Sequence, residues 1–385
     1  MTKLRVALDV LPLAGESTGV GRFCAGLAGA LLDRNDLDLR AYAIARHARS
    51  DLAAPAGALG LGVRTWAVQA RLANALWSRV SLPAVEWLVG RVDVVHGTNY
   101  VVPPTRHAGR VVTVHDLTAL RYPQMCLPAS LAYPRLVTRA ARGGAFVHVP
   151  SRFVRDEVVE LLGLDAERVR VVPHGLDEPA RAEVAGRSTG SSRPSVADSS
   201  RAAPYVLALG AVEPRKDLPT LVMAFAEIAR RHDDLELVVA GPDGWASSSF
   251  DAAVAASGAA RRVVRIGYLP EAERASLLAG ATVLAYPSLY EGFGFPPLEA
   301  MAAGVPVVAT AAGAVPEVVG AAAELVPPGD VPALAGALER VIDDEVLRSR
   351  LIGAGRVRAA SFTWASAAAG MVEIYYEAAS LGRAG

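Results

Sequence analysis

Short apolar runs rich in β-branched residues alternate along this chain with longer stretches rich in alanine and leucine. Near-continuous apolar runs are typical of parallel strands that helices cover on both faces. The predicted strands are residues 6–10, 92–96, 111–115, 146–149, 170–172, 205–209, 235–240, 263–266, 282–285 and 305–309. The predicted helices are residues 23–32, 131–141, 218–231, 271–279, 331–341 and 364–378. The alternation predicts an α/β fold with doubly wound parallel sheets.

The length of 385 residues favours two domains, because a single core usually stops growing at about 250–300 residues. Residues 179–203 are rich in serine, glycine, alanine and proline and hold almost no large apolar side chain, which is typical of a linker or insertion. We therefore expect one Rossmann-like domain over residues 1–178 and a second over 204–363. Two such domains imply a cleft, and ligands of open parallel sheets lie beyond the carboxyl ends of the strands.

The composition excludes several classes of function. The 39 basic and 39 acidic residues balance, so the whole chain gives no argument for a nucleic-acid partner. Two cysteines, Cys24 and Cys126, are too few for a cysteine-based metal site. The apolar run at the start is short and contains Asp9, which favours a first strand over a signal peptide. We expect a cytoplasmic protein, and peripheral contact with the inner face of the cytoplasmic membrane stays open.

The segment Tyr286–Glu299 (YPSLYEGFGFPPLE) follows a predicted strand and leads into a predicted helix. Gly292 and Gly294 permit unusual backbone angles and expose N–H groups, and such a turn before a helix N-terminus favours an anion. Glu291 and Glu299 flank the turn, and carboxylates there would accept hydrogen bonds from sugar or ribose hydroxyls. By spacing alone, an ordinary strand–loop–helix connection remains the alternative.

A second loop places cations at a strand end. In Leu209–Leu218 (LGAVEPRKDL), Arg215 and Lys216 precede a predicted helix, where they can reach a diphosphate. Lysine occurs elsewhere only at Lys3, so Lys216 is an unusual choice of cation for this chain. A solvated charge pair is the alternative.

The first predicted domain holds a glycine-rich loop and histidines at strand ends. Gly19, Gly21 and Arg22 follow the first strand in GESTGVGR, but Cys24 stands where a dinucleotide-binding motif needs its third glycine. His115 and Asp116 end another strand, in VVTVHD. A lone histidine of this kind is more often structural than functional.

The segment from Tyr286 to Ala302 resembles the E-x7-E motif of retaining GT-B glycosyltransferases, in particular glycosyltransferase family 4. Its relatives read Tyr/Phe-Pro-Ser, then Glu-Gly-Phe-Gly, Pro and Glu-Ala-Met-Ala. Arg215-Lys216 resembles the family's pyrophosphate-binding element, although many members carry an arginine where this chain has Ala211. The T-x-H-D element around His115 and the N-terminal glycine loop are similar as well. The resemblance covers roughly residues 4–380.

The resemblance implies a GT-B fold and metal-independent, retaining transfer of a hexose, with no cofactor beyond the nucleotide sugar. It implies that Arg215, Lys216 and the N–H groups near Gly292–Phe295 hold the diphosphate. Glu291 and His115 would then hold the sugar, and Glu299 the ribose. The same resemblance implies these further site residues: Phe293, Gly241, Tyr268, Gly19 and Gly21 on the donor, and Arg22, His96 and Asp116 towards the acceptor. It also implies that the helix at 364–380 packs back onto the first domain.

The E-P-R-K branch is similar to mannosyltransferases, so GDP-mannose is the expected donor, with a glycan, a lipid-linked or a small-molecule acceptor. Three alternatives remain open: a UDP- or dTDP-sugar donor, a nucleotide-sugar epimerase, and a non-catalytic binding protein. His174 departs from the family's usual asparagine, and we interpret it as a domain-junction residue.

Two further patterns have a structural and a functional interpretation. Asp36-Leu-Asp38 mimics a metal-binding D-x-D, but no strand end precedes it, and we interpret it as a polar turn. Trp66, Ala70, Ala73, Trp77 and Val80 fall at helical spacing among arginines. This stripe predicts a helix that packs on its own domain or rests on a membrane.

Overall fold

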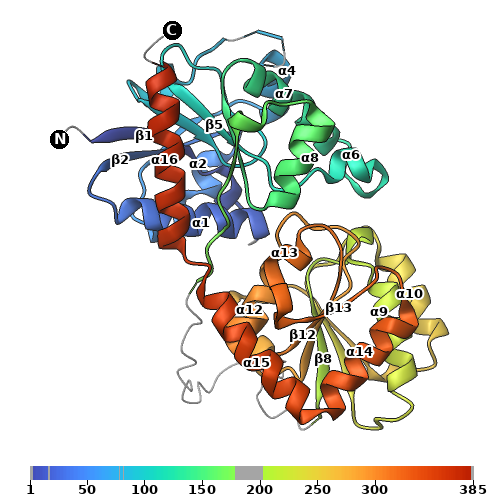
Figure 1. The fold of residues 1–385 in the computed structure, drawn as a ribbon. Helices are drawn as coiled ribbons and strands as arrows, with labels where there is room; N and C mark the ends of the chain where they lie inside the picture. The colour runs from blue at the N-terminus through green and yellow to red at the C-terminus, as the bar shows by residue number, and fades with distance from the viewer. Residues whose placement is uncertain (1–2, 16–17, 78, 81, 178–202, 383–385) are drawn as a thin grey trace, which may run out of the picture. The chain divides into compact units, whose positions relative to one another are not determined.

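The computed structural model describes residues 3–15, 18–77, 79–80, 82–177 and 203–382 (Figure 1). The predicted linker 179–203 lies outside the described residues except for residue 203. The chain divides into two compact units, each with its own core. Unit 1 comprises Met1–Gly175 and Phe362–Gly385, and unit 2 comprises Leu176–Ser361.

Unit 1 is built on a seven-stranded parallel sheet of order β3-β2-β1-β4-β5-β6-β7. Its strands are β1 (Leu4–Asp9), β2 (Leu37–Ile44), β3 (Val63–Trp66), β4 (Val94–Gly97), β5 (Gly109–Thr113), β6 (Phe146–Val149) and β7 (Val169–Val171). Its helices are α1 (Gly19–Leu32), α2 (Ala48–Asp51), α3 (Ala53–Ala58), α4 (Ala70–Trp77), α5 (Glu86–Val89), α6 (Thr118–Arg121), α7 (Tyr133–Arg142), α8 (Arg152–Leu162) and α16 (Trp364–Gly382). The winding direction reverses between β1 and β4, which are neighbours in the sheet.

Unit 2 repeats this plan with a six-stranded parallel sheet of order β10-β9-β8-β11-β12-β13. Its strands are β8 (Tyr205–Leu209), β9 (Glu236–Ala240), β10 (Val263–Ile266), β11 (Val283–Tyr286), β12 (Val307–Thr310) and β13 (Glu324–Val326). Its helices are α9 (Leu218–Ile228), α10 (Ser247–Ala256), α11 (Glu271–Ala279), α12 (Phe295–Ala303), α13 (Val315–Val319), α14 (Val331–Asp343) and α15 (Glu345–Ala360). Here the winding reverses between β8 and β11.

The predicted fold class, two doubly wound α/β units, is confirmed. Each predicted strand falls on an observed one to within a few residues. Strands β2, β3 and β13 were not predicted, and neither were several helices, among them α10 and α15. β2 and β3 contain charged residues, and β13 has only three residues, so none of them forms an uninterrupted apolar run.

The helix α16 joins unit 1 although it follows unit 2 in the chain (Figure 1). It packs against β5 and α1. Gly26 of α1 lies under the Trp364 ring, where an added Cβ would come within 2.0 Å of a ring atom. At Gly109, the first residue of β5, an added Cβ would meet the Ala378 carbonyl oxygen at 2.1 Å. Gly26 and Gly109 therefore allow α16 to approach α1 and β5 closely.

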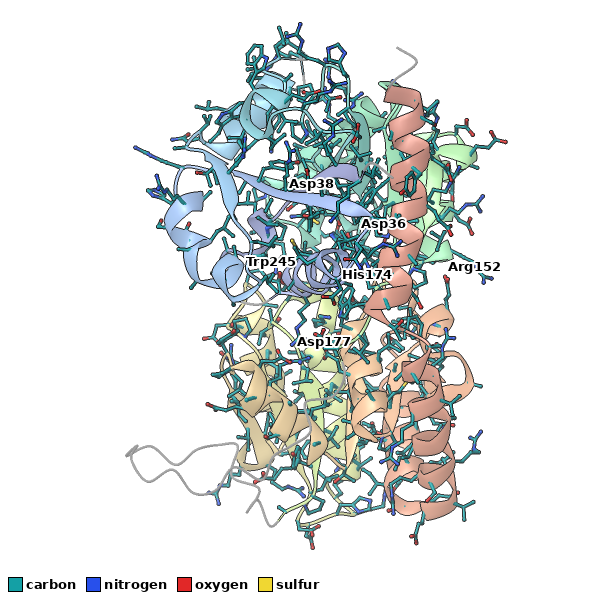
Figure 2. The ribbon with its side chains drawn as sticks, turned by 90° about the vertical axis from the view of Figure 1, so that its left-hand side faces the viewer. Asp36, Asp38, Arg152, His174, Asp177 and Trp245 are labelled. Atoms are coloured by element: carbon teal, nitrogen blue, oxygen red, sulfur yellow. The ribbon has the colours of Figure 1, made fainter. Side chains whose placement is uncertain are left out.

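The interpretation of Asp36-Leu-Asp38 as a polar turn is wrong for its second half. Asp38 belongs to β2, where it pairs with Arg5 of β1, and only Asp36 lies in the turn (Figure 2). Arg34 binds Asp36 at 2.8 Å and Arg40 binds Asp38 at 2.9 Å. Both carboxylates are thus held by arginines.

The predicted single helix from Trp66 to Val80 is also wrong. Trp66 ends strand β3, and α4 begins at Ala70. Ala73 and Trp77 are buried in the unit 1 core, whereas Val80 is exposed. Among the described residues, no helix is both long enough and apolar enough to cross a bilayer.

Candidate functional site

In unit 2, the loops after the neighbouring strands β8 and β11 meet where the winding of the sheet reverses. The first loop leads into a 3-10 turn, Pro214–Lys216, and the second leads into α12. The two loops are hydrogen-bonded to each other, since the Leu289 N–H donates to the Arg215 carbonyl oxygen at 2.8 Å. Ligands of doubly wound sheets bind at such a reversal point.

Both cations of the first loop form ion pairs with Glu291. Lys216 Nζ donates to Glu291 Oε1 at 2.7 Å, and Arg215 Nη1 lies 2.5 Å from the same oxygen. Lys216 Nζ also donates to the Tyr286 hydroxyl at 3.0 Å, and Arg215 Nη1 donates to the Tyr290 carbonyl oxygen at 3.0 Å. The side chains of Arg215, Lys216 and Glu291 are 19%, 12% and 10% exposed. The structure therefore brings three predicted site residues together in one largely buried cluster.

Electrostatics decide the protonation of this cluster. Burial alone would raise the pKa of Glu291, but the charges of Arg215 and Lys216 outweigh it and hold the pKa at about 2. Burial lowers the pKa of Lys216, and Glu291 opposes that shift. Glu291 is thus an ionised hydrogen-bond acceptor at neutral pH and a very weak base, which leaves proton transfer in the site to another group.

Glycines let the backbone close around the cluster. Gly210 has φ +138°, and a Cβ there would lie 3.2 Å from Cε of Lys216. Gly313, in the loop after β12, has φ +58°, and a Cβ there would lie 2.3 Å from the Glu291 carbonyl oxygen. At Gly241 a Cβ would meet the Gly210 carbonyl oxygen at 2.1 Å. Gly241 was predicted to contact the donor, and in the structure its backbone packs closely against the loop after β8.

The predicted Gly292–Phe295 turn starts α12. Gly294 has φ +106° at the N-cap of the helix, a conformation that strongly favours glycine. Phe293 and Phe295 are buried and contact each other edge to face, with 5.4 Å between ring centroids. The aromatic pair fixes the turn from within, so the N–H groups of the turn rather than the rings are placed for an anion.

Glu299 lies in α12 and forms an ion pair with Arg274 of α11. The two side chains are only 13% and 16% exposed. Arg274 was not predicted, and a basic residue facing an acidic one across two helices leaves no spacing signature in the sequence. Tyr268, in the loop after β10, is 44% exposed.

In unit 1, the reversal point lies between β1 and β4. Asp9 ends β1, and its Oδ1 accepts a hydrogen bond from the Leu11 N–H at 3.0 Å. Burial raises the pKa of Asp9 to about 7, and the Leu11 N–H opposes that shift. Thr98, just beyond β4, donates from its hydroxyl to the Asp9 carbonyl oxygen at 2.8 Å. Asp9 was not predicted as a site residue; an acidic residue at the end of a buried strand is the signal that could have found it.

His115 follows β5 and contacts Thr98. Its Nε2 donates to the Thr98 carbonyl oxygen at 2.9 Å, so the proton of the neutral ring sits on Nε2. Burial lowers the pKa of His115 to about 4, against the opposing effects of Thr98 and Asp116. Its Nδ1 has no hydrogen-bond partner within the described part of the chain. His115 therefore offers a neutral acceptor nitrogen to a hydroxyl.

The expectation that His96 faces an acceptor is wrong. The side chain is fully buried inside unit 1, and both ring nitrogens are hydrogen-bonded. The Tyr375 hydroxyl donates to His96 Nδ1 at 2.8 Å, and His96 Nε2 donates to the Thr113 hydroxyl at 2.8 Å. Thr113 donates to His148 Nδ1 at 2.9 Å, and His148 Nε2 donates to the Val172 carbonyl oxygen at 2.9 Å. Because a carbonyl only accepts, this last bond fixes the direction of the whole chain.

The remaining predicted residues of unit 1 are near helix starts. Thr18 caps α1 by accepting a hydrogen bond from the Gly21 N–H at 3.1 Å. Gly19 and Arg22 lie in the first turn of α1, and at Gly21 a Cβ would come within 2.9 Å of the Pro12 carbonyl oxygen. Asp116 accepts a hydrogen bond from the Thr118 N–H at 2.9 Å at the start of α6. His174, which is labelled in Figure 2, is buried. Its ring centroid lies 4.3 Å from that of Phe23.

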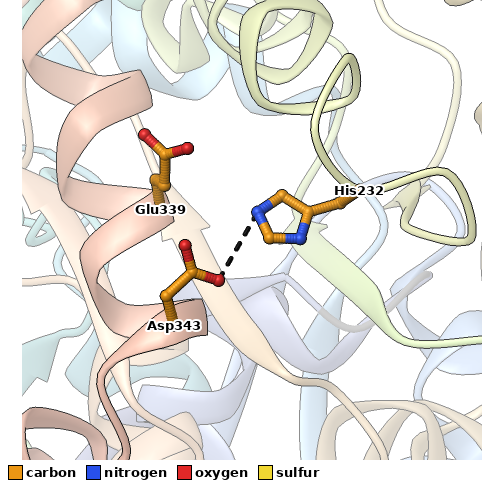
Figure 3. Close-up of side chains that lie close together, drawn as sticks. All are labelled: His232, Glu339 and Asp343. Atoms are coloured by element: carbon orange, nitrogen blue, oxygen red, sulfur yellow. Dashed lines mark ion pairs between the residues drawn. The ribbon is translucent and has the colours of Figure 1, made fainter.

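Unit 2 also holds a group of three possible metal ligands, outside the loops that follow β8 and β11. His232, Glu339 and Asp343 bring one ligand atom each within 4.8 Å of one another (Figure 3). Glu339 already forms an ion pair with Arg231, and Asp343 is more than half exposed. We interpret the group as surface ion pairs.

Two doubly wound parallel-sheet units, one with its cations at the reversal point, have the architecture of GT-B glycosyltransferases. Comparison with known families agrees: residues 196–358 match the model described as glycosyl transferases group 1, and residues 17–178 match glycosyltransferase family 4. The chain belongs to glycosyltransferase family 4, and it is a glycosyltransferase.

Similar proteins differ in the sugar they transfer. The chain is 32% identical to the MMP alpha-(1→4)-mannosyltransferase of Mycolicibacterium hassiacum over 331 residues, covering 77% of this chain and 74% of that protein. It is 30% identical to the 2-deoxystreptamine glucosyltransferase of Streptomyces kanamyceticus over 316 residues, covering 80% of this chain and 76% of that protein.

A similar solved structure is Anabaena Alr3699/HepE in complex with UDP-glucose. The two share a TM-score of 0.72 at 19% identity, over 97% of this chain and all of that one. The likeness extends over both units and shows the fold.

Proposed function

We propose that this glycosyltransferase transfers mannose from GDP-mannose, with retention of configuration and without a metal ion. The acceptor would be a glycan, a lipid-linked sugar or a small molecule. The cluster of Arg215, Lys216 and Glu291 carries the proposal, because it places two cations and one ionised carboxylate at the reversal point of unit 2. The surplus positive charge suits a diphosphate, and the carboxylate suits sugar hydroxyls.

In this mechanism Arg215 and Lys216 stabilise the charge that develops on the leaving diphosphate, together with the N–H groups of the turn before α12. Each well-placed donor of this kind is worth about 2.7–4 kcal/mol in the transition state. Such cations and N–H groups supply the stabilisation that a metal ion supplies in other transferases. Because the pKa of Glu291 is about 2, the acceptor proton leaves to a phosphate oxygen of the donor, on the face that the acceptor attacks.

The other predicted residues have narrower roles in the proposal. Glu291 accepts hydrogen bonds from the sugar, and Glu299 accepts them from the ribose. His115 accepts one from a sugar hydroxyl at Nδ1, and Tyr268, being exposed, contacts the base. The chain would act in the cytoplasm, since neither Cys24 nor Cys126 forms a disulfide.

A panel of nucleotide sugars tests the donor. Thermal stability is measured with GDP-mannose, UDP-glucose and a dTDP-hexose, each with and without EDTA. We expect the largest stabilisation with GDP-mannose, unchanged by EDTA, and its loss in the Glu291→Gln and Lys216→Met variants. Stabilisation by the UDP sugar alone would contradict the mannose assignment and favour glucose, which the glucosyltransferase relative makes the second choice.

Stereochemistry is read from the product. With a synthetic mannoside acceptor, nuclear magnetic resonance should show the same anomeric configuration as in the donor. Inversion would contradict the retaining mechanism without affecting the donor assignment.

A further inference from the structure

One stretch of unit 1 exposes an unusual number of large apolar side chains. Of the large hydrophobic residues that are exposed in the described part of the chain, a third lie between residues 68 and 87. We call them the 68–87 surface: Val68, Leu72, Leu76, Val80, Leu82 and Trp87. Leu72 and Trp87 are 62% and 61% exposed. Clustered exposure of this kind marks an interaction site more often than a free surface.

The secondary structure explains why these side chains are left outside. Helix α4 buries Ala73 and Trp77 in the unit 1 core and exposes Leu72 and Leu76, one turn apart. Val80 continues the same spacing, since its N–H donates to the Leu76 carbonyl oxygen. The short helix α5 is flanked by Val85 and ends at Val89, both buried in the same core, and it exposes Trp87. Both elements are therefore amphipathic, and the apolar residues outside are additional to those that the core needs.

The charge around this surface is one-sided, although the whole chain is neutral. Residues 61–110 hold six arginines and two acidic residues. The fold already binds both acidic groups: Glu86 accepts hydrogen bonds from the N–H groups of residues 106–108, and Asp93 forms an ion pair with Arg5 at 2.8 Å. Arg64, Arg79, Arg91 and Arg106 are exposed. The partner of the 68–87 surface must therefore be apolar and anionic at once.

We propose that the 68–87 surface docks on an anionic lipid bilayer. The leucines and valines enter the boundary between headgroups and acyl chains, and the exposed arginines contact lipid phosphates. Trp87 suits the interface, where tryptophan is enriched in membrane proteins. A second copy of the chain is a poorer occupant, because a two-fold contact would bring two cationic surfaces face to face. The proposal is independent of the donor assignment.

Vesicle sedimentation tests the proposal on the full chain. Binding is measured to vesicles of phosphatidylcholine alone and of phosphatidylcholine mixed with phosphatidylglycerol, at low and high salt. We expect binding to the anionic vesicles that salt weakens, and little binding to the neutral ones. The Leu72→Ser/Leu76→Ser variant should bind roughly tenfold more weakly or worse. The Arg79→Gln/Arg91→Gln/Arg106→Gln variant should lose affinity on the order of a hundredfold.

A matched control uses Val346 and Val357 of α15, which are 80% and 77% exposed. The Val346→Ser/Val357→Ser variant removes comparable apolar surface from unit 2 and should bind vesicles as the parent does. All variants should keep the thermal midpoint and its shift with nucleotide sugar. Lack of binding to anionic vesicles, or an equal loss in the control variant, overturns the proposal. Retention on an immobilised acidic polypeptide without vesicle binding overturns it in favour of an acidic protein partner.

Discussion

Two cations that converge on one carboxylate oxygen, as Arg215 and Lys216 do on Glu291, are a costly arrangement for a folded chain. Burial of three charges requires desolvation of each, and such groups seldom add net stability. A role in ligand binding explains these charges more simply, because Arg215 and Lys216 can bind a diphosphate while Glu291 accepts hydrogen bonds from the sugar.

Replacement of Lys216 by methionine keeps the length of the side chain and removes its charge. We expect the turnover number to fall by a factor on the order of 10²–10³, since one donor to the leaving group is lost. Steady-state kinetics with saturating donor measure the effect. Lys3, the other lysine of the chain, gives a matched control, and Lys3→Met should leave turnover unchanged. Near-normal turnover of Lys216→Met would remove this residue from the site.

The raised pKa of Asp9 in unit 1 can be tested through the pH dependence of stability. Its pKa is raised on folding to about 7, so the folded state keeps a proton that the unfolded state loses near pH 4. The contribution of Asp9 to the free energy of unfolding therefore falls as the pH rises from about 4 to about 7 and is level above. Asp9→Asn removes this penalty, and the variant should gain roughly 4 kcal/mol relative to the parent between about pH 4 and about pH 8. Urea unfolding at both pH values measures it, and an equal difference at the two would contradict the raised pKa.

At the level of elements, α16 is bound to unit 1 through packing and through the buried chain of hydrogen bonds that begins at the Tyr375 hydroxyl. Tyr375→Phe deletes that hydroxyl and leaves Nδ1 of His96 buried without its donor. We expect a loss of about 1–3 kcal/mol in the free energy of unfolding, measured by urea unfolding. Tyr376, its half-exposed neighbour, supplies the control, because Tyr376→Phe should be nearly neutral. Equal effects of the two changes would show that the buried hydrogen bond of the Tyr375 hydroxyl does not stabilise the fold.

The strands and helices that the sequence predicted are those with clear hydrophobic periodicity. Strands such as β8 are apolar throughout, whereas Asp38 and Arg40 interrupt β2 and only its place beside β1 makes it a strand. The cluster of Arg215, Lys216 and Glu291 was predicted by its motifs as separate residues of one site. The ion pairs between these residues were not predicted. Lys216 and Glu291 are 75 positions apart, and they come into contact only because β8 and β11 are neighbours in the sheet. His96 was misplaced because a strand-end histidine can point to either face of a sheet.

At the level of the whole molecule, the buried histidines lie in unit 1 alone. Burial is the largest influence on His96, His115, His148 and His174, and it lowers the pKa of each. They stay neutral in the folded state and take up protons on unfolding at acid pH. Their contribution to stability is full above the unfolded pKa of about 6.5 and is lost progressively as the pH falls below it.

Unit 1 should therefore unfold more easily at about pH 5 than at about pH 8, by up to about 1.4 kcal/mol per pH unit for each histidine. Trp245 is the one tryptophan of unit 2 in the sequence, so the fluorescence of a Trp245→Phe variant reports on unit 1. Urea unfolding followed by this fluorescence measures the effect. The same midpoint at both pH values would contradict the neutral buried histidines.

The return of α16 to unit 1 has a consequence for biosynthesis. A ribosome completes the chain of unit 2, which is continuous, before it makes α16, and domains generally fold as they emerge. Unit 2 can therefore fold while unit 1 still lacks α16, and the faces of β5 and α1 that receive this helix stay open until it has been made. Nascent unit 1 should depend on chaperones for longer than nascent unit 2, even though it is made first.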